Sequence, residues 1–592
     1  MLRFCESPDD RRYVHSTSLI RSPVENMSAF NKTFPTIDYK TQYQLGLNES
    51  DYWLIVDLFC GGGGGSTGLE MGLGRRVDIC VNHDEAAISL HTANHPYATH
   101  YQTDVWGVDP VIASGGMTVG WLHASPDCTH FSQAAGGQPR SKEIRDLPWV
   151  VVKWAGKVRP LVISAENVKQ ILGWTNLVAK RCAETGRVVK LDGSIAAPGE
   201  VVPRKEQYLI PDSGKPTGNA LHRRKQRRKY RRHGSPVNRT WNNFVRSLKA
   251  LGYNVDWRVS RACDDGAPTI RERLFLIARC DGHPIEWPEA SHAKHPKKGQ
   301  LPYRTAAECI DWSNLGQSIW GRKRPLVKST NVRIATGIER FVVNGRPFIL
   351  PATHQGSVRL HDIDEPMRTV TGANRGELMV GTPIIAPFIT EHANASQQRN
   401  MSAEEPLRTI CAQVKGGHFS VVAPILVQAN GGKNTTPAHP VVAPFSTITG
   451  SGSQQQLLTA KLDSHDFQNQ QFNNDQINAA LRVADFMLEH GTRRPESTVL
   501  TVDERLDLVT VFVDGVRYLI VDVCLRMLDP RELYRAQGFP ENYIIDRGHD
   551  GRKLNKTQMC KMVGNSVSPL QLSRIARFND PWKARPLGML AA

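Results

Sequence analysis

The sequence predicts an α/β fold built on a doubly wound sheet, with a separate β-rich region inserted into it. Three observations support this prediction. The apolar run at residues 52–59 is typical of a buried parallel strand, and five glycines lead from it into a helical pattern. Strand and helix patterns then alternate through residue 102. The middle of the chain instead holds short β-type segments separated by Gly, Asn and Pro.

The elements of the predicted sheet follow one another along the chain. The helix after the glycines contains Leu69 and Met71. We expect further strands at residues 77–82, near 102, and at 120–125, 161–165, 254–260 and 273–280, with helices at 84–94 and 244–251. A helical pattern resumes near Arg531 and ends in the segment 557–578.

The β-rich region contains an internal repeat. The segments P-M-R-T-V-T, P-L-R-T-I-C and P-F-S-T-I-T begin at Pro366, Pro406 and Pro444, which are 40 and 38 residues apart. This spacing predicts three β-rich copies that form a domain of their own. A repeat with a purely structural role is the alternative.

Charge and cysteine usage limit the classes of function. The 592 residues include 74 Lys and Arg against 57 Asp and Glu, a net charge of +17, which favours a polyanionic partner such as nucleic acid. Eight basic residues lie between Arg223 and Arg232 without an acid, inside an insertion at 169–239, and we expect phosphate contacts there rather than a merely solvated loop. The 11 cysteines include no C-x-x-C pair, which argues for reduced thiols and against structural zinc.

Targeting signals are not evident in the sequence. No stretch of 18 apolar residues occurs, and the first ten residues carry acids and no apolar segment. We therefore expect a cytoplasmic protein without a membrane partner. Residues 1–50 are polar and without a clear period, and we interpret them as an extension.

Several motifs occur in an order that resembles the cytosine-C5 DNA methyltransferase family. A glycine-rich turn follows Asp57-Leu-Phe, a cysteine follows Ala124-Ser-Pro-Asp, and E-N-V and R-x-R segments come later. Two further motifs lie near the C-terminus. In chain order, the six motifs span Asp57 to Glu70, Ala124 to Cys128, Glu166 to Val168, Arg271 to Arg273, Arg531 to Pro540 and Gly564 to Val567. The resemblance covers about 300 residues outside the insertion and the repeats.

The resemblance implies a domain plan and partners. It implies a Rossmann-like methyltransferase sheet at 51–282 and 521–592, with a β-rich target-recognition domain at 283–520. It also implies S-adenosylmethionine as the methyl donor, double-stranded DNA as the substrate with the target base flipped out, no metal, and a restriction-modification context. We expect a monomer.

The family's chemistry assigns three catalytic residues. Cytosine C5 is a poor nucleophile, so a thiolate must first add to C6, and the resemblance makes Cys128 that nucleophile. Glu166 of E-N-V would protonate N3 of the base. Arg273, the second Arg of R-x-R, would orient the cytosine carbonyl oxygen and stabilise developing charge.

The resemblance also implies how the donor is bound. Phe59 should stack on its adenine, Asp104 should accept a hydrogen bond from the adenine amine, and Gly61 and Gly63 should leave room for it. The C-terminal block should close the pocket through Asn565 and Ser566. The ribose acid follows from a weaker match: the family usually has N-E after the second strand, whereas this chain has N-H-D-E, and Asp84 is our choice.

Two departures keep other functions open. The family's Pro-Pro-Cys is Pro-Asp127-Cys here, and its Gln before R-x-R is Thr269. A carboxylate beside the thiol should raise the pKa of Cys128 unless Asp127 is paired or protonated. The alternatives are a cytosine acceptor in RNA, a modified sulfonium donor, or a catalytically silent DNA-binding protein on the same scaffold.

Overall fold

A computed structural model describes most of the α/β part of the chain and separate pieces of the β-rich part. The described residues are 49–128, 130–131, 141–212, 218–233, 237–311, 313–314, 316–326, 328–343, 348–351, 361–362, 378–381, 388–392, 399–402, 418–428, 438–440, 455–464, 472–492, 499–513, 516–527 and 529–583. A 3-10 helix, η1 (Glu49–Tyr52), precedes the first strand. The predicted extension at 1–50 therefore lies almost entirely outside the described residues, as do the repeat segments at Pro366, Pro406 and Pro444.

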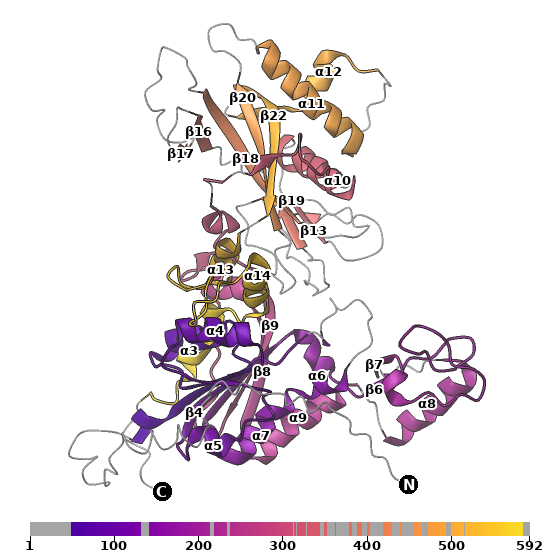
Figure 1. Ribbon diagram of the computed structural model, residues 1–592, viewed down its shortest axis with the longest axis vertical. Coiled ribbons are helices and arrows are strands. Elements are labelled where there is room, and N and C mark those ends of the chain that lie inside the picture. Colours follow the sequence, from indigo (N-terminus) through magenta and orange to yellow (C-terminus); the bar gives the residue numbers. More distant parts are fainter. Residues whose placement is uncertain are drawn as a thin grey trace, which may run out of the picture.

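A seven-stranded mixed sheet forms the centre of the α/β part and confirms the predicted fold class (Figure 1). Its strands, in the order β3-β2-β1-β4-β5-β9-β8, are β3 (Thr99–Gln102), β2 (Ile79–Asn82), β1 (Leu54–Leu58), β4 (Val119–Ala124), β5 (Val162–Asn167), β9 (Glu272–Arg279) and β8 (Asn254–Arg261). The first five are parallel, and the order reverses direction between β1 and β4. In such sheets ligands bind beyond the carboxyl ends of the strands at this switch point.

The last two strands join the sheet in the reverse of their chain order. β9 pairs antiparallel with both β5 and β8, so it lies inside the sheet while β8 forms the edge. The side chains explain this placement. From Leu274 to Arg279 every residue of β9 is buried, whereas β8 is largely exposed. A continuous buried run is typical of an interior strand, and a largely exposed strand is suited to an edge.

Helices cover both faces of the sheet. The helices are α3 (Gly64–Leu73), α4 (Glu85–Asn94), α5 (Pro110–Ser114), α6 (Lys142–Asp146), α7 (Trp149–Val158), α9 (Arg239–Ala250), α13 (Pro530–Gln537), α14 (Lys556–Asn565) and α15 (Pro569–Phe578). On one face, α7 and α9 pack Trp154 and Phe244 against strand residues such as Leu122. On the other, α3 and α15 pack Leu69 and Leu572 against the sheet.

The β-rich part is an antiparallel sheet backed by helices (Figure 1, upper part). Its strands are β12 (Gln317–Ser318), β16 (Phe388–His392), β17 (Arg399–Ser402), β18 (His418–Gln428), β19 (Ala438–Pro440), β20 (Gln455–Ser464), β21 (Thr510–Val513) and β22 (Val516–Met527). A separate three-stranded sheet contains β13 (Phe348–Pro351), β14 (His361–Asp362) and β15 (Leu378–Gly381). The helices α10 (Lys328–Gly337), α11 (Asn474–His490) and α12 (Val502–Asp507) also lie in this region. Because β22 is continuous to Met527, the boundary expected at residue 520 falls inside a strand.

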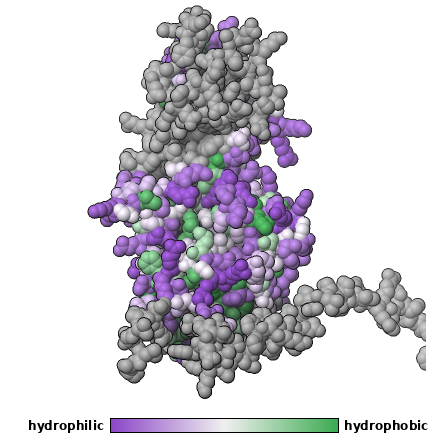
Figure 2. All heavy atoms as spheres, turned by 90° about the vertical axis from the view of Figure 1, so that its left-hand side faces the viewer, coloured by the Kyte–Doolittle hydropathy of each residue, from purple (hydrophilic) through white to green (hydrophobic). Residues whose placement is uncertain are grey.

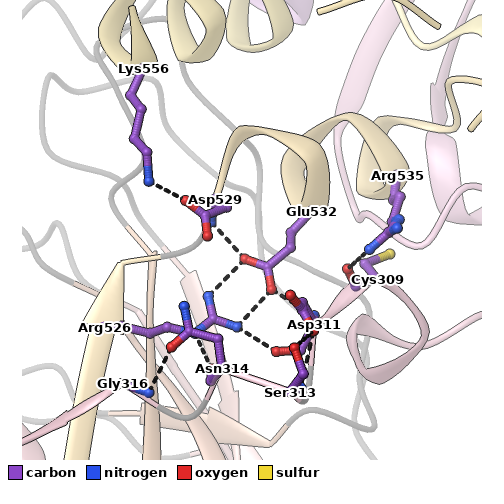
Figure 3. Close-up of polar contacts among 10 residues, drawn as sticks. All are labelled: Cys309, Asp311, Ser313, Asn314, Gly316, Arg526, Asp529, Glu532, Arg535 and Lys556. Carbon is purple, nitrogen blue, oxygen red and sulfur yellow. Dashed lines mark hydrogen bonds and ion pairs between the residues drawn. The ribbon is translucent and has the colours of Figure 1, made fainter. Parts of the chain in front are cut away.

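A cluster of polar contacts holds the two parts together where the chain passes between them (Figure 3). Arg526, near the end of β22, is almost buried and forms two hydrogen bonds with Glu532 of α13, at 2.9 and 2.8 Å. Asp311 lies where the chain leaves the α/β part, and it contacts the same pair. Glu532 accepts a hydrogen bond from its backbone N–H at 2.7 Å, and Arg526 donates to its carbonyl at 2.9 Å. The buried ion pair therefore links both crossings of the chain to one helix.

The surface of the described part is mainly hydrophilic on the face shown in Figure 2, where hydrophobic residues are scattered among polar ones. Within the described residues, no helix combines the length and the apolar character that a membrane crossing requires.

Candidate functional site

The three predicted catalytic residues come from adjacent strands at one edge of the sheet. Cys128 follows β4 by four residues, Glu166 lies near the carboxyl end of β5, and Arg273 lies near the start of β9. β9 runs antiparallel to β5, with Asn167 opposite Leu274, and this pairing brings the start of β9 beside Glu166. Three residues that are far apart in the sequence therefore lie together in one cluster.

Glu166 is held between two arginines. Its Oε1 lies 3.0 Å from Nε of Arg273 and 3.8 Å from Nη2 of Arg271. Only 7% of Glu166 and 2% of Arg271 are exposed, so these charges interact with little solvent screening. Burial and the neighbouring Arg273 lower the pKa of the Arg271 guanidinium, and Glu166 raises it. The arrangement keeps a carboxyl and two cations together at the carboxyl edge of the sheet.

Arg271 is a site residue that the sequence interpretation missed. Its Nη1 donates a 3.0 Å hydrogen bond to the carbonyl of Gly564, which belongs to the C-terminal G-N-S-V block. A signal was present, because Arg271 is the first Arg of the R-x-R motif, directly before β9. Arg271 therefore connects Glu166 to a segment 293 residues further along the chain.

The thiol of Cys128 is partly buried among these charges. Burial raises the pKa of Cys128, and the carboxylates of Glu166 and Asp127 raise it further. The guanidinium of Arg273 is the largest opposing influence, and Arg271 adds to it. The two arginines thus favour the thiolate that the surrounding burial and acids disfavour.

Asn167 positions the loop that carries Cys128. Its side-chain amide donates a 2.9 Å hydrogen bond to the carbonyl of Pro126, two residues before the cysteine. Its Oδ1 accepts from the backbone N–H of Val168 at 2.9 Å, which fixes the amide's orientation. The E-N-V motif therefore supplies both the acid and the residue that anchors the P-D-C loop.

Replacing Asp127 by Asn should lower the pKa of Cys128, because it removes a carboxylate that destabilises the thiolate. Below the thiol pKa, a lower value means more thiolate at a given pH. Asp127 is exposed, so its effect is screened by water, and we expect alkylation at neutral pH to become faster by less than about tenfold. Iodoacetamide rates on both proteins measure this. Equal rates would show that the carboxylate does not act on Cys128.

The glycine-rich turn between β1 and α3 provides room for a ligand at Gly61. Phe59 and Gly61 both have positive φ, at 64° and 51°. A Cβ built on Gly61 would meet nothing closer than the Phe59 carbonyl at 3.7 Å, so the space beside it is open. Gly63 is the N-cap of α3, which has no side-chain capping hydrogen bond. The turn therefore presents open backbone at the switch point of the sheet.

Gly63, expected to make room for the donor, instead makes room for another part of the protein. A Cβ on Gly63 would lie 2.1 Å from the hydroxyl of Tyr543, which donates a 2.7 Å hydrogen bond to the carbonyl of Gly62. The next glycine, Gly64, is covered by Ser566, whose Oγ would lie 1.9 Å from an added Cβ. Only the first part of the glycine run therefore faces open space.

Gly63→Ala should lower the free energy of unfolding by about 2 to 4 kcal/mol, because the methyl group collides with Tyr543 and φ of 90° is unfavourable for alanine. Tyr543→Phe alone should cost about 1 kcal/mol through its lost hydrogen bond. In the Gly63→Ala background the same change should be stabilising, since it removes the clashing oxygen. Urea unfolding of the four proteins measures the cycle, and strict additivity would contradict this packing.

The predicted donor acids occupy different settings. Asp84 caps α4, accepting from the backbone of Ala86 and Ala87 at 3.0 and 3.1 Å through Oδ1, while its Oδ2 accepts from Lys561 at 2.8 Å. Burial opposes and Lys561 favours its ionisation, and the pKa of Asp84 is lowered overall. Asp104 is exposed, and its Oδ1 accepts from the backbone of Trp106 at 2.8 Å. Both carboxylate oxygens of Asp84 therefore already accept hydrogen bonds within the protein.

The C-terminal block reaches the turn as the motif order predicts. Ser566 is 6% exposed and lies against Gly64, and its hydroxyl donates to the carbonyl of Val567 at 3.0 Å. Asn565 ends α14 and is exposed beside it. Ser566 therefore brings the C-terminal block against the first residue of α3.

A group of potential metal ligands lies in the core behind the turn. Ligand atoms of Cys60, Cys80 and His91 lie within 4.8 Å of one another. Both ring nitrogens of His91 already take part in hydrogen bonds, with Ser66 at 2.9 Å and with His100 at 2.8 Å. These hydrogen bonds give His91 a structural role in the core.

The chain matches a known protein family and several curated relatives. The family model described as C-5 cytosine-specific DNA methylase matches residues 54–184, 230–335 and 451–578, which is more than half of the chain. The Type II methyltransferase M.AgeI of Thalassovita gelatinovora is 24% identical over 252 residues, covering 41% of this chain and 43% of that protein. The Type II methyltransferase M.SacI of Streptomyces achromogenes is 31% identical over 81 residues, covering 14% and 20%. The matched part spans less than half of either relative.

Among solved structures, the chain is similar to a putative DNA modification methyltransferase encoded within a prophage of E. coli. The two share 16% sequence identity, with 89% of this chain and 98% of that chain covered and a TM-score of 0.37. The Dnmt2 methyltransferase of S. pombe shows 11% identity, 90% and 100% coverage and a TM-score of 0.38.

Proposed function

Because the chain belongs to the C-5 cytosine-specific DNA methylase family, we propose that it transfers a methyl group from S-adenosylmethionine to C5 of a cytosine in double-stranded DNA, through a covalent adduct with Cys128. The observation that carries this proposal is the cluster of Cys128, Glu166, Arg271 and Arg273 at the carboxyl edge of the sheet. A cysteine, a carboxyl and two cations supply a nucleophile, a proton donor and charge stabilisation in one place.

The reaction begins when the Cys128 thiolate forms a bond to C6 of the flipped cytosine. The electron pair of the C5–C6 double bond shifts to C4–C5, and the pair of the C4–N3 double bond moves to N3. N3 takes a proton from Glu166 in its protonated form, so the resulting enamine is nucleophilic at C5. S-adenosylmethionine supplies an electrophilic methyl group to that carbon. This transfer releases S-adenosylhomocysteine. Water then takes the C5 proton, the C5–C6 double bond re-forms as the bond between C6 and sulfur breaks, and the N3 proton returns to Glu166. The Cys128 thiolate is regenerated, with methylated cytosine as the product.

The arginines prepare both partners of this addition. Arg273 favours the thiolate of Cys128 and, 3.0 Å from Glu166, orients the carboxyl that meets the base. Arg271 lies near Glu166 and is itself fixed by its hydrogen bond to the carbonyl of Gly564. Asn167 fixes the approach of Cys128 by binding the carbonyl of Pro126. Positioning of this kind supplies much of the rate enhancement in such reactions.

The residues around the glycine turn fit the proposed donor. The open space beside Gly61 suits a ligand that approaches the backbone closely. Phe59 would supply an aromatic ring for the adenine, and Asp104 would supply an acceptor for its amine. Asn565 and Ser566 would enclose the donor from the C-terminal block. Asp84 would bind the ribose by sharing its Oδ2 with Lys561.

The β-rich part, at about residues 283–520 and extended by β22 to Met527, would choose the DNA sequence. It is connected to α13 through the Arg526–Glu532 pair, so a duplex held against it would be presented to the catalytic edge in a defined orientation. Sequence reading requires contacts with base edges as well as phosphates.

Methyl transfer from tritium-labelled donor tests the proposed function directly. The purified protein is incubated with plasmid DNA or with transfer RNA, and modified cytosines in the DNA are mapped by bisulfite sequencing. We expect label in the DNA at one recurring sequence. Label only in RNA would reject the DNA substrate, and label in neither, with DNA binding retained, would indicate a catalytically silent protein.

A further inference from the structure

The insertion between β5 and α9 folds into a small module. It contains η3 (Lys169–Gly173), β6 (Leu177–Ala179), η4 (Arg204–Glu206), β7 (Leu209–Pro211) and α8 (Ala220–His233), with β6 and β7 paired antiparallel. The family model does not match residues 185–229, so most of this module lies outside the matched residues. In Figure 1 the module projects from the side of the α/β part, next to α6. We name it the basic arm.

The basic run of the sequence forms a helix. From Arg223 to Arg232 the helix α8 carries eight cations and no acid. Tyr230 ties the helix to the arm, because its hydroxyl donates a 2.6 Å hydrogen bond to Asp212 after β7. On a helix of 3.6 residues per turn, Arg224, Lys225 and Arg228 lie on the side opposite Tyr230.

The outward side of α8 is unneutralised. Arg224, Lys225 and Arg228 are exposed, and none of them forms an ion pair with any residue that the structure describes. Like charges at this spacing repel one another and destabilise the helix. A bound polyanion would reduce this repulsion. Cations three and four positions apart on a helix are close enough to meet successive phosphates of one DNA strand.

The arm is also connected to the catalytic loop. Arg145 of α6, 4% exposed, donates to the carbonyl of His130 at 3.0 Å, two residues after Cys128, and to the carbonyl of Thr175 in the arm at 3.3 Å. Its guanidinium lies 4.5 Å from the ring centre of Phe131. One buried side chain therefore contacts both the catalytic loop and the base of the arm.

A cavity of about 320 Å³ lies between the arm and α6. Four cations and two acids contribute to its lining, which comprises Lys142, Arg145, Arg204 and Arg239 with Asp146 and Asp212. Basic side chains therefore continue from α8 along the base of the arm toward the loop that carries Cys128.

We propose that the basic arm binds the phosphates of duplex DNA that flanks the target cytosine, outside the sequence that the β-rich part reads. This proposal rests on the proposed function, because that function places duplex DNA at the catalytic edge beside the arm. The arm contributes affinity and no sequence choice, since cations that contact phosphates read no bases.

The salt dependence of DNA binding tests the proposal. One variant replaces Arg224, Lys225 and Arg228 by Gln. A matched control replaces Lys157, Arg246 and Lys249, three exposed cations on α7 and α9, by Gln. Binding to duplexes of roughly 12 and 40 base pairs, about 40 and 140 Å long, is followed by fluorescence anisotropy at several salt concentrations. Equal melting temperatures establish that both variants fold.

The expected result separates the two duplexes. On the long duplex the arm variant should lower the slope of log K against log salt by up to about 3 units, one for each lost phosphate contact, while the control keeps the wild-type slope. On the short duplex, which is filled by the catalytic and β-rich parts, wild type and arm variant should agree. An unchanged slope on the long duplex, or an equal fall in the control, would overturn the proposal.

The same proteins distinguish this proposal from the proposed function. If the wild type methylates DNA and the arm variant keeps its slope, the arm proposal alone fails. If the slope falls as expected but the wild type methylates no cytosine, the proposed activity fails and the arm remains a DNA-binding element. Transfer RNA that competes better than duplex DNA, with an unchanged slope on DNA, would assign the arm to RNA and reject it as a duplex contact.

Discussion

Cys128→Ser should abolish methyl transfer, with a fall of at least about a thousandfold, or ~4 kcal/mol in the activation free energy. The hydroxyl of serine is a far weaker nucleophile toward C6 than a thiolate, and Arg273 and Arg271 cannot ionise it. DNA affinity should remain, because Cys128 contributes no phosphate contact. Tritium transfer and fluorescence anisotropy measure the two properties separately.

The matched control for Cys128 is Cys280→Ser. Cys280 is also partly buried, but it follows the far end of β9 and donates to the carbonyl of Pro160 at 3.3 Å. We expect this variant to retain wild-type turnover. Substantial activity in Cys128→Ser, or an equal loss in Cys280→Ser, would contradict the assignment of the nucleophile.

Glu166→Gln should lower turnover by about 10² to 10⁴-fold, the range for loss of a positioned proton donor. The amide keeps the shape of the side chain, but it cannot deliver a proton to N3 and it removes the negative partner of Arg271 and Arg273. Loss of Glu166 should also lower the pKa of Cys128, since that carboxylate opposes the thiolate. Alkylation of Cys128 should therefore become faster while turnover falls.

The control for Glu166 is Glu272→Gln on the neighbouring strand. Glu272 lies between the two arginines in sequence but pairs with Lys169 at 2.5 Å, and its side chain is 26% exposed. Glu272→Gln removes one negative charge, as Glu166→Gln does, but it leaves the side chains of Glu166, Arg271 and Arg273 in place. Turnover should therefore stay near wild type. Wild-type turnover in Glu166→Gln, with unchanged DNA binding, would show that another group protonates the base.

The strands of the sheet could be predicted from their apolar runs, whereas the position of the last two required tertiary information. Residues 254–260 and 273–280 were predicted as a pair, and they do pair. Their chain order suggests that β8 joins the sheet first. The order is reversed because Leu274 to Ala278 must be covered on both faces, which only an interior position provides.

The glycine run shows where motif reading reaches its limit. A row of glycines predicts close approach of something to the backbone, but it does not say whether that is a ligand or the protein itself. Gly61 faces open space, whereas Gly63 and Gly64 accommodate Tyr543 and Ser566 from about 480 and 500 residues away. Such contacts depend on how the C-terminal helices pack, and no local pattern encodes them.

Among the charged residues, some features could be predicted from the sequence and others depend on the fold. The motifs assigned Glu166 and Arg273 to one site, and the two side chains lie 3.0 Å apart. The hydrogen bond from Arg271 to Gly564 follows only from the fold. The basic run was expected in a loop or in contact with phosphate, and it forms α8. That helix was predictable, because the segment consists of strong helix formers without Gly or Pro.

Covalent trapping tests the central proposal most directly. Once the target sequence is mapped, a duplex carrying 5-fluorocytosine at that position is incubated with the protein and donor. Fluorine cannot leave C5 as a proton does, so the adduct should persist, and mass spectrometry of the digested complex should place the base on the sulfur of Cys128. A stable adduct on another residue, or the absence of any adduct from a preparation that methylates ordinary DNA, would contradict the account.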